Sequence, residues 1–127
     1  MHGPTYMANP LACSAANATL NYINKYSVLK KVKKIEKFFE FNLKKFHKFS
    51  FVSGTRFLGA IGVIEVKEIN QKTLLWLRNE FIKRGVWVRP LRNVVYFMPP
   101  FIIKKKQLEK IFNATEEIFE LWQERKF

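Results

Sequence analysis

The strongest constraint on the fold is a helical pattern of apolar side chains near the C-terminus. Apolar residues recur there every three or four positions, which predicts an amphipathic helix over about residues 105–124. The side chains that fall on its apolar face are Leu108, Ile111, Phe112, Thr115, Ile118, Phe119 and Trp122. A face this rich in aromatic residues has to be covered by a second layer of structure.

A helix is also predicted near the N-terminus, over about residues 9–24. Asn9 is a suitable cap, and Pro10 suits the first helical position because its φ is fixed and its nitrogen carries no proton. The segment is rich in alanine, so we expect a packing helix, with Cys13 as one of its packing residues. Since Cys13 is the only cysteine, an intrachain disulfide and a cysteine-based metal cluster are excluded.

Two further amphipathic helices are predicted between these. Ser27 is expected to cap the first of them, whose apolar stripe continues to about Lys48. Asn70 is expected to cap the other, which runs to about Arg84. Gly85 is well placed to end that helix in a left-handed conformation.

The region before the Asn70 helix changes to β-rich residues. Residues 57–66 are predicted to form a strand, and the pair Ser53-Gly54 is a turn signal in front of it. The strand contains Gly59 and Gly62, which indicate a bulge or the close approach of another part of the chain.

Two shorter strands follow Gly85, over 86–89 and 93–98, and are predicted to join around residues 90–92 as a hairpin-like unit. The prolines 99 and 100 end the second strand because neither can donate a hydrogen bond to a ladder. The order of elements predicts an α+β fold, with a small mixed or antiparallel sheet covered by helices on one face.

The net charge of +13 on 127 residues invites a second interpretation, a small basic nucleic-acid-binding module. The lysines are concentrated over residues 25–48, where most lie between the apolar positions and belong to the solvated side of a helix. They follow no recognition motif, so we expect weak, sequence-independent binding and no specific nucleic acid partner. A steep salt dependence of RNA or DNA affinity would discriminate between the two interpretations.

The sequence contains no stretch apolar enough to span a membrane. Its first residues match neither a secretory signal nor a transit peptide, so a cytoplasmic location is expected. The histidines His2 and His47 are isolated in sequence, and we expect no metal site.

Two residues stand out as candidate ligands for an anion. Thr5 lies in a polar turn just before a helix start, where a hydroxyl and free backbone N–H groups form a plausible anion site. Alternatively, Thr5 only satisfies local backbone donors. Arg89 precedes Pro90 at the end of a predicted strand, where it can bind a carboxylate through two parallel hydrogen bonds or else reach only water or a surface acid.

A third feature is a group of large side chains around the two prolines: Tyr96, Phe97, Met98 and Phe101. These residues suit either the wall of an apolar channel or the hydrophobic core.

Several longer motifs carry a family resemblance. They are His2-Gly3-Pro4-Thr5-Tyr6-Met7-Ala8-Asn9-Pro10-Leu11-Ala12-Cys13, the glycine-containing stretch 58–65, Gly85-Val86-Trp87-Val88-Arg89-Pro90, and the stretch 95–103 with its two prolines. In order and spacing they resemble class III pyridoxal-phosphate aminotransferases, and the resemblance covers nearly the whole chain. Within that class they are most similar to members that transfer an amino group from S-adenosylmethionine to 8-amino-7-oxononanoate, giving 7,8-diaminononanoate for biotin synthesis.

The resemblance implies a role for several residues and a cofactor. Thr5, with the backbone of Pro4, would bind the phosphate of pyridoxal 5'-phosphate across a homodimer interface, and Gly3 would border the substrate. Arg89 would hold the substrate carboxylate, and Tyr96 would lie near the substrate pocket.

The same resemblance implies a division of the chain. Residues 1–26 would be the cofactor-phosphate segment with its packing and linker helix. Residues 27–127 would be the C-terminal small α+β domain, as in fold-type I pyridoxal-phosphate enzymes.

The sequence departs from the family in two places. Ala8 stands where the family usually has glycine, and Leu91-Arg92 stand where an aromatic residue and glycine are common. In addition, the lysine that carries the cofactor belongs upstream of these motifs in the family. We therefore expect a C-terminal fragment with no catalytic residue of its own, inactive when alone.

Overall fold

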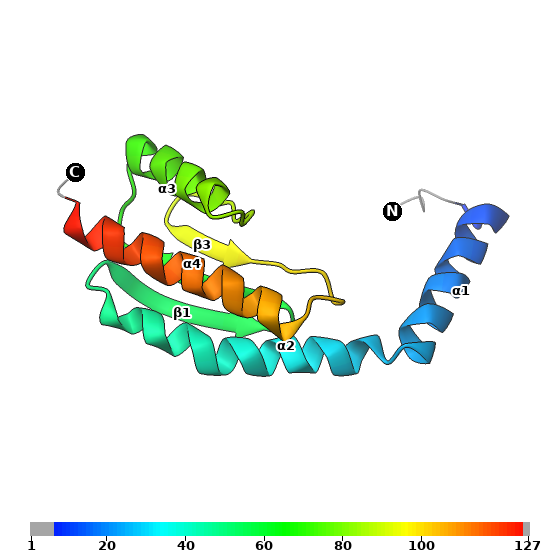
Figure 1. Cartoon of the computed structure of the whole chain (residues 1–127). Coiled ribbons are helices and arrows are strands. Elements are labelled where there is room, and N and C mark those ends of the chain that lie inside the picture. Colours follow the sequence, from blue (N-terminus) through cyan, green and yellow to red (C-terminus); the bar gives the residue numbers. More distant parts are fainter. Residues whose placement is uncertain (1–6, 126–127) are drawn as a thin grey trace.

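The computed structural model describes residues 7–125 (Figure 1), and it contains four α-helices, a 3₁₀-helix and three strands within that range. In chain order they are α1 (Pro10–Lys25), α2 (Val28–Asn42), the 3₁₀-helix η1 (Leu43–Lys48), β1 (Val52–Leu58), β2 (Ile61–Val66), α3 (Gln71–Lys83), β3 (Val94–Phe97) and α4 (Lys105–Glu124).

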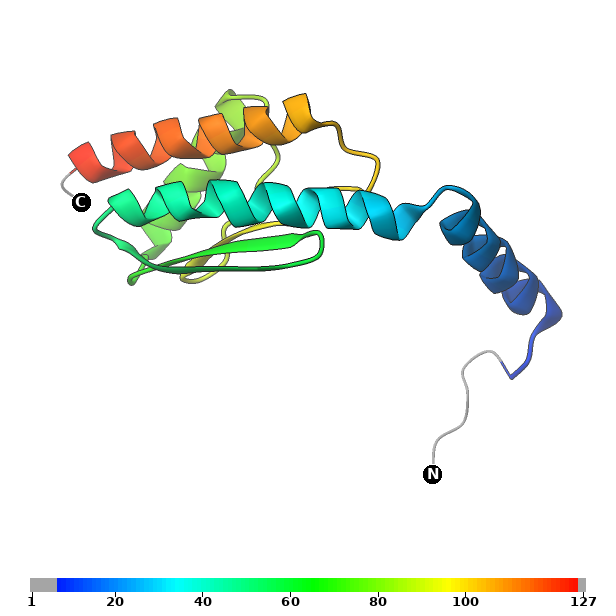
Figure 2. The ribbon, with the colours of Figure 1, turned by 90° about the horizontal axis from the view of Figure 1, so that it is seen from below.

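The strands form one antiparallel sheet in the order β1-β2-β3. Gly62 pairs with Phe97, and Ile64 pairs with Val95, so these four positions point to the same face of the sheet. All four are buried, because α2 and α4 lie across this face (Figures 1 and 2). The predicted α+β fold, with helices packed on a small antiparallel sheet, is confirmed.

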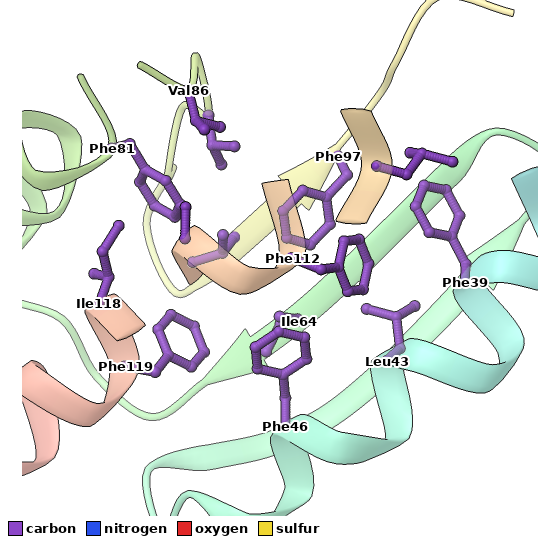
Figure 3. Packing of buried hydrophobic residues seen from close by; sticks show 14 of the residues in the cluster. Phe39, Leu43, Phe46, Ile64, Phe81, Val86, Phe97, Phe112, Ile118 and Phe119 are labelled. Carbon is purple, nitrogen blue, oxygen red and sulfur yellow. The ribbon is translucent and has the colours of Figure 1, made fainter. Parts of the chain in front are cut away.

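Aromatic rings fill the space between the two helices and the sheet (Figure 3). Phe112 of α4 has its ring centroid 5.8 Å from that of Phe39 and 5.0 Å from that of Phe97. Further along, Phe46 and Phe119 meet edge to face at 5.5 Å. The apolar face predicted for α4 is therefore the centre of the core, and the predicted bounds of that helix are confirmed.

The structure corrects the prediction for the second helix in two ways. It ends as an α-helix at Asn42 and continues to Lys48 only as the tighter η1. Ser27 does not cap it: the residue has φ of 49° and its side chain makes no capping hydrogen bond. Its left-handed conformation instead turns the chain sharply between α1 and α2, so that α1 extends away from the sheet (Figure 2).

The β-hairpin also differs from the prediction. The turn lies at Gly59-Ala60, where Gly59 has φ of 56°, and residues 57–66 are divided between two strands. Ser53-Gly54 lies within β1, at a register shift against β2. Gly62 does mark a close approach, because a Cβ at this position would lie 3.1 Å from the ring of Phe39.

The predicted strand over 86–89 is wrong. This segment follows α3 without entering the sheet, although its side chains alternate between buried and exposed. The Asn70 cap is confirmed, since its side chain accepts a hydrogen bond from the Thr73 backbone at 2.8 Å.

Helix α1 has the predicted start, but it buries no side chain within the described part of the chain, and Cys13 is exposed. The packing expected of this helix therefore finds no partner among residues 7–125. Among the same residues, none of the helices combines the length and the hydropathy needed to cross a bilayer.

Candidate functional site

Arg89 is positioned by the way α3 ends. Gly85 adopts φ of 63°, its N–H donates to the carbonyl of Ile82 at 2.9 Å, and the N–H of Val86 donates to the carbonyl of Phe81 at 3.0 Å. This is the turn that glycine makes without strain after a helix. The extended segment that follows buries Val86 and leaves Arg89 exposed.

Tyr96 approaches from the sheet. It lies on β3 opposite Val63, between the buried residues Val95 and Phe97. Successive side chains of a strand point to opposite faces, so Tyr96 lies on the face that α2 and α4 leave open, and it is only partly buried.

Both residues belong to the lining of one cavity of about 910 Å³. Arg89 and Tyr96 both line it, and its apolar wall includes Trp87, Met98 and Pro99. Its size is in the range of small-molecule sites. Of the aromatic and Met group considered above, Phe97 is core, whereas Met98 is 65% exposed and contributes to this wall.

The charge of the cavity lining is entirely positive. Arg89, Lys104 and Lys110 contribute to it, and no Asp or Glu does. Within residues 7–125, Arg89 has neither an ion pair nor a side-chain hydrogen bond. Its guanidinium is free to bind a carboxylate through two parallel hydrogen bonds, since no acid of the described chain competes for it.

A tight turn holds the chain just after Arg89. The backbones of Leu91 and Val94 exchange two hydrogen bonds of 2.9 and 3.0 Å, and Arg92 between them has φ of 50°. Arg92 is one of the two departures from the family, at a position where glycine is common. The left-handed conformation explains that preference, because glycine adopts it at little cost.

Arg78 of α3 supports the same turn and was not identified from the sequence. Its Nη2 donates to the carbonyl of Pro90 at 3.3 Å, while its Nε is buried without a partner among the described residues. No local pattern marks this residue, because the contact joins a helix to a turn 12 positions later in the chain.

The predicted cofactor-phosphate segment is only partly visible. Gly3, Pro4 and Thr5 lie outside the described residues. The first turn of α1 is capped by Asn9, whose side chain accepts from the N–H groups of Leu11 and Ala12 at 3.0 and 3.2 Å. Asn9 thus occupies two of the donors at this helix start, and the anion site predicted in the turn before it lies outside the described residues.

Ala8, the other departure from the family, also has a positive φ, of 55°. Both positions at which the chain replaces a family glycine are therefore left-handed. This agreement between family pattern and backbone supports the motif assignment at both positions.

The acids with displaced pKa values lie elsewhere. Hydrogen bonds lower the pKa of Glu116, with the larger effect from Lys45 and the smaller from Lys48. The pKa of Glu80 is lowered in the same way, mainly by Lys83 and next by Arg84. None of these groups lines the Arg89 cavity. Among the described residues no cluster of three or more His, Cys, Asp or Glu side chains is arranged to hold a metal ion.

Comparison with known proteins decides the family. A sequence model of the class-III aminotransferases matches residues 1–119. The chain belongs to this family. The resemblance carried by the motifs is confirmed, and with it membership of a family of pyridoxal-phosphate-dependent transaminases.

Two relatives of this class-III aminotransferase chain both carry the name adenosylmethionine-8-amino-7-oxononanoate aminotransferase. That of Buchnera aphidicola subsp. Schizaphis graminum is 41% identical over 117 residues, which are 92% of this chain and 27% of the relative. That of Corynebacterium glutamicum is 39% identical over 115 residues, 90% of this chain and 26% of the relative.

A solved structure supports the same relationship. The enzyme of that name from Methanocaldococcus jannaschii superposes with a TM-score of 0.72 at 28% identity, covering 91% of this chain and 30% of that chain. The chain thus spans about a quarter of the length of the curated relatives it matches.

Proposed function

We propose that this chain is the C-terminal part of an adenosylmethionine-8-amino-7-oxononanoate aminotransferase. The complete enzyme would transfer an amino group from S-adenosylmethionine to 8-amino-7-oxononanoate and give 7,8-diaminononanoate for biotin synthesis. Support comes from the name shared by the relatives and from the cavity that joins Arg89 to Tyr96. The unpaired Arg89 in a cavity without acids is the observation that carries the proposal.

In this proposal Arg89 binds the carboxylate of 8-amino-7-oxononanoate. Its planar guanidinium offers two parallel N–H donors, and the nearby lysines Lys104 and Lys110 add a positive potential. The apolar wall of Trp87 and Met98 suits the aliphatic chain of a nine-carbon acid. The hydroxyl of Tyr96 borders the same space and would orient the substrate.

The cofactor contacts rest on the family alone. Pro4 and Thr5 would hold the phosphate of pyridoxal 5'-phosphate and Gly3 would border the substrate, in a cytoplasmic homodimer. The cofactor supplies the electron sink for amino transfer when it is bound. The motifs in this chain do not include the family's cofactor-carrying lysine, so we propose that the chain alone is inactive.

A chimeric enzyme tests this proposal. The segment of the Buchnera relative that aligns with this chain is replaced by residues 1–127, and the chimera is assayed for 7,8-diaminononanoate formation. We expect the chimera to be active and to support growth of a biotin auxotroph that lacks this aminotransferase. We expect the 127-residue chain alone to do neither.

Thr5→Ala in the chimera checks the cofactor assignment separately. We expect weaker retention of pyridoxal phosphate on dialysis, with Ser50→Ala, in the exposed turn before β1, as a control. A folded chimera that binds cofactor but forms no product would refute the assigned function. An active 127-residue chain would refute the proposed incompleteness.

A further inference from the structure

A second cavity of about 730 Å³ shares Ile102 and Ile103 of the 101–104 loop with the first, and we call it the α2–α4 groove. One wall is the face of α2 that carries Phe38 and Phe41. The other wall is the loop at Phe101 and Ile102 and the start of α4. Neither Arg89 nor Tyr96 lines this groove.

The floor of the α2–α4 groove reaches the hydrophobic core. Ile35 and Leu108 line it and are only 3% and 4% exposed. Towards the rim, Phe41 and Ile102 are 74% and 73% exposed, so two large apolar side chains stand in water at its mouth. Such a patch, continuous with a depression of ligand size, is typical of a binding site.

The rim of the groove is basic. Lys31, Lys34 and Lys37 follow one another along α2, Lys105 faces them from α4, and the lining contains no Asp or Glu. Lys105 has an acidic neighbour, with its Nζ 3.6 Å from a carboxylate oxygen of Glu109. The three lysines of α2 have no ion pair within residues 7–125, so their charges are left for an external anion.

We propose that the α2–α4 groove binds a single-chain anionic amphiphile of the fatty-acid class. Its alkyl chain lies on the floor between Phe38 and Leu108, and its anionic head pairs with the lysine row of α2. A row of lysines beside an apolar floor fits a molecule with an anionic head and an apolar tail. A carboxylate and an alkyl phosphate share the required head-group chemistry.

The binding test uses the 127-residue chain and dodecanoate below its micelle concentration, followed by calorimetry. We expect saturable binding of one molecule at the groove that weakens with added salt. Affinity should rise about fourfold for each methylene from octanoate to dodecanoate. Dodecyl phosphate in place of dodecanoate tells which head group is preferred. Dodecyltrimethylammonium has the same chain and the opposite charge and should not bind measurably.

Matched variants locate the site. Lys34→Glu and Phe41→Ser change exposed groove residues, and each should weaken dodecanoate binding roughly tenfold. Lys72→Glu and Leu75→Ser make the same changes on the exposed surface of α3 and should leave it unaltered. Circular dichroism establishes that each variant is folded.

Five outcomes would overturn the proposal. The first is that the cationic amphiphile binds as tightly as dodecanoate, and the second is that the groove variants and the control variants bind dodecanoate equally. An affinity that does not depend on alkyl chain length would show that the chain does not lie on the apolar floor. Binding to anionic vesicles without binding of monomeric dodecanoate would indicate a membrane-facing surface instead. Arg89→Ala separates the two cavities: loss of dodecanoate binding in that variant alone places the ligand at the proposed substrate site and leaves the groove without a ligand.

Discussion

The turn that follows Pro90 offers a stability prediction that depends on a single backbone angle. Arg92 has φ of 50°, in the left-handed region, and it is exposed without an ion pair among the described residues. Replacing it by glycine removes the steric cost of that conformation. Replacing it by alanine removes the side chain and keeps the cost, so the two variants separate backbone from side chain.

The magnitude follows from two opposing terms. A left-handed conformation costs an L-residue about 1–2 kcal/mol, and glycine costs about 0.5–1 kcal/mol more than other residues in lost chain entropy. Arg92→Gly should therefore raise the free energy of unfolding by about 0.5–1 kcal/mol, and the midpoint of thermal unfolding by about 3 °C. The free energy of unfolding of Arg92→Ala should stay within about 0.5 kcal/mol of that of the parent.

Chemical denaturation followed by circular dichroism measures both variants. Gly85→Ala is the converse experiment, because Gly85 has φ of 63° and the added Cβ would meet only the flexible end of Lys110 at 3.3 Å. From the same two opposing terms we expect it to lose about 0.5–1 kcal/mol of unfolding free energy. Equal stabilities for the Gly and Ala variants at position 92 would refute the reasoning, since the turn would then not require a left-handed residue.

Three further predictions concern the core, the ion pairs and the turn. Gly62→Ala should cost about 1–3 kcal/mol by denaturation, because its Cβ would crowd the fully buried ring of Phe39 at 3.1 Å. Glu116→Gln should be less stable than the parent at neutral pH, because the pKa of Glu116 is lowered in the folded state. The ionised carboxylate therefore stabilises the fold fully above its ordinary pKa of 4.5, and this stabilisation is lost as the pH falls through the lowered pKa. The difference between the two proteins should therefore shrink in acid, as denaturation at several pH values would show. Arg78→Ala should speed amide hydrogen exchange in the turn after Pro90, and unchanged exchange would show that this hydrogen bond does not hold the turn.

The elements with strong local signals were predictable from the sequence. The α4 face repeats at helical spacing over 20 residues, and the caps at Asn9 and Asn70 use side-chain hydrogen bonds that involve only neighbouring residues. Gly85 was assigned correctly for the same reason: a helix end is a local event.

The errors arose where distant parts of the chain decide the structure. Ser53-Gly54 and Gly59-Ala60 are both acceptable turns, and the pairing of β1 with β2 selects the second. The segment 86–89 has strand-like residues, but burial against the helices produces its alternation without a neighbouring strand.

The candidate site shows the same division. The sequence identified Arg89 and Tyr96 individually, as residues of the right type at the right position in the family motifs. Their shared cavity and the support from Arg78 depend on how α3, β3 and the 98–104 segment pack together. The sequence shows which residue types are present. Only the fold shows that no acid of the described residues lines the cavity beside Arg89.

The central claim is that Arg89 holds the substrate carboxylate, and the KM for 8-amino-7-oxononanoate in the chimeric enzyme tests it most directly. Arg89→Ala should raise that KM by about 100-fold, the loss of a charge-assisted bidentate contact worth up to about 3 kcal/mol. Arg92→Ala removes the same charge from a residue that does not line the cavity and should leave the KM within about twofold. Equal KM values for the Arg89 and Arg92 variants would contradict the account.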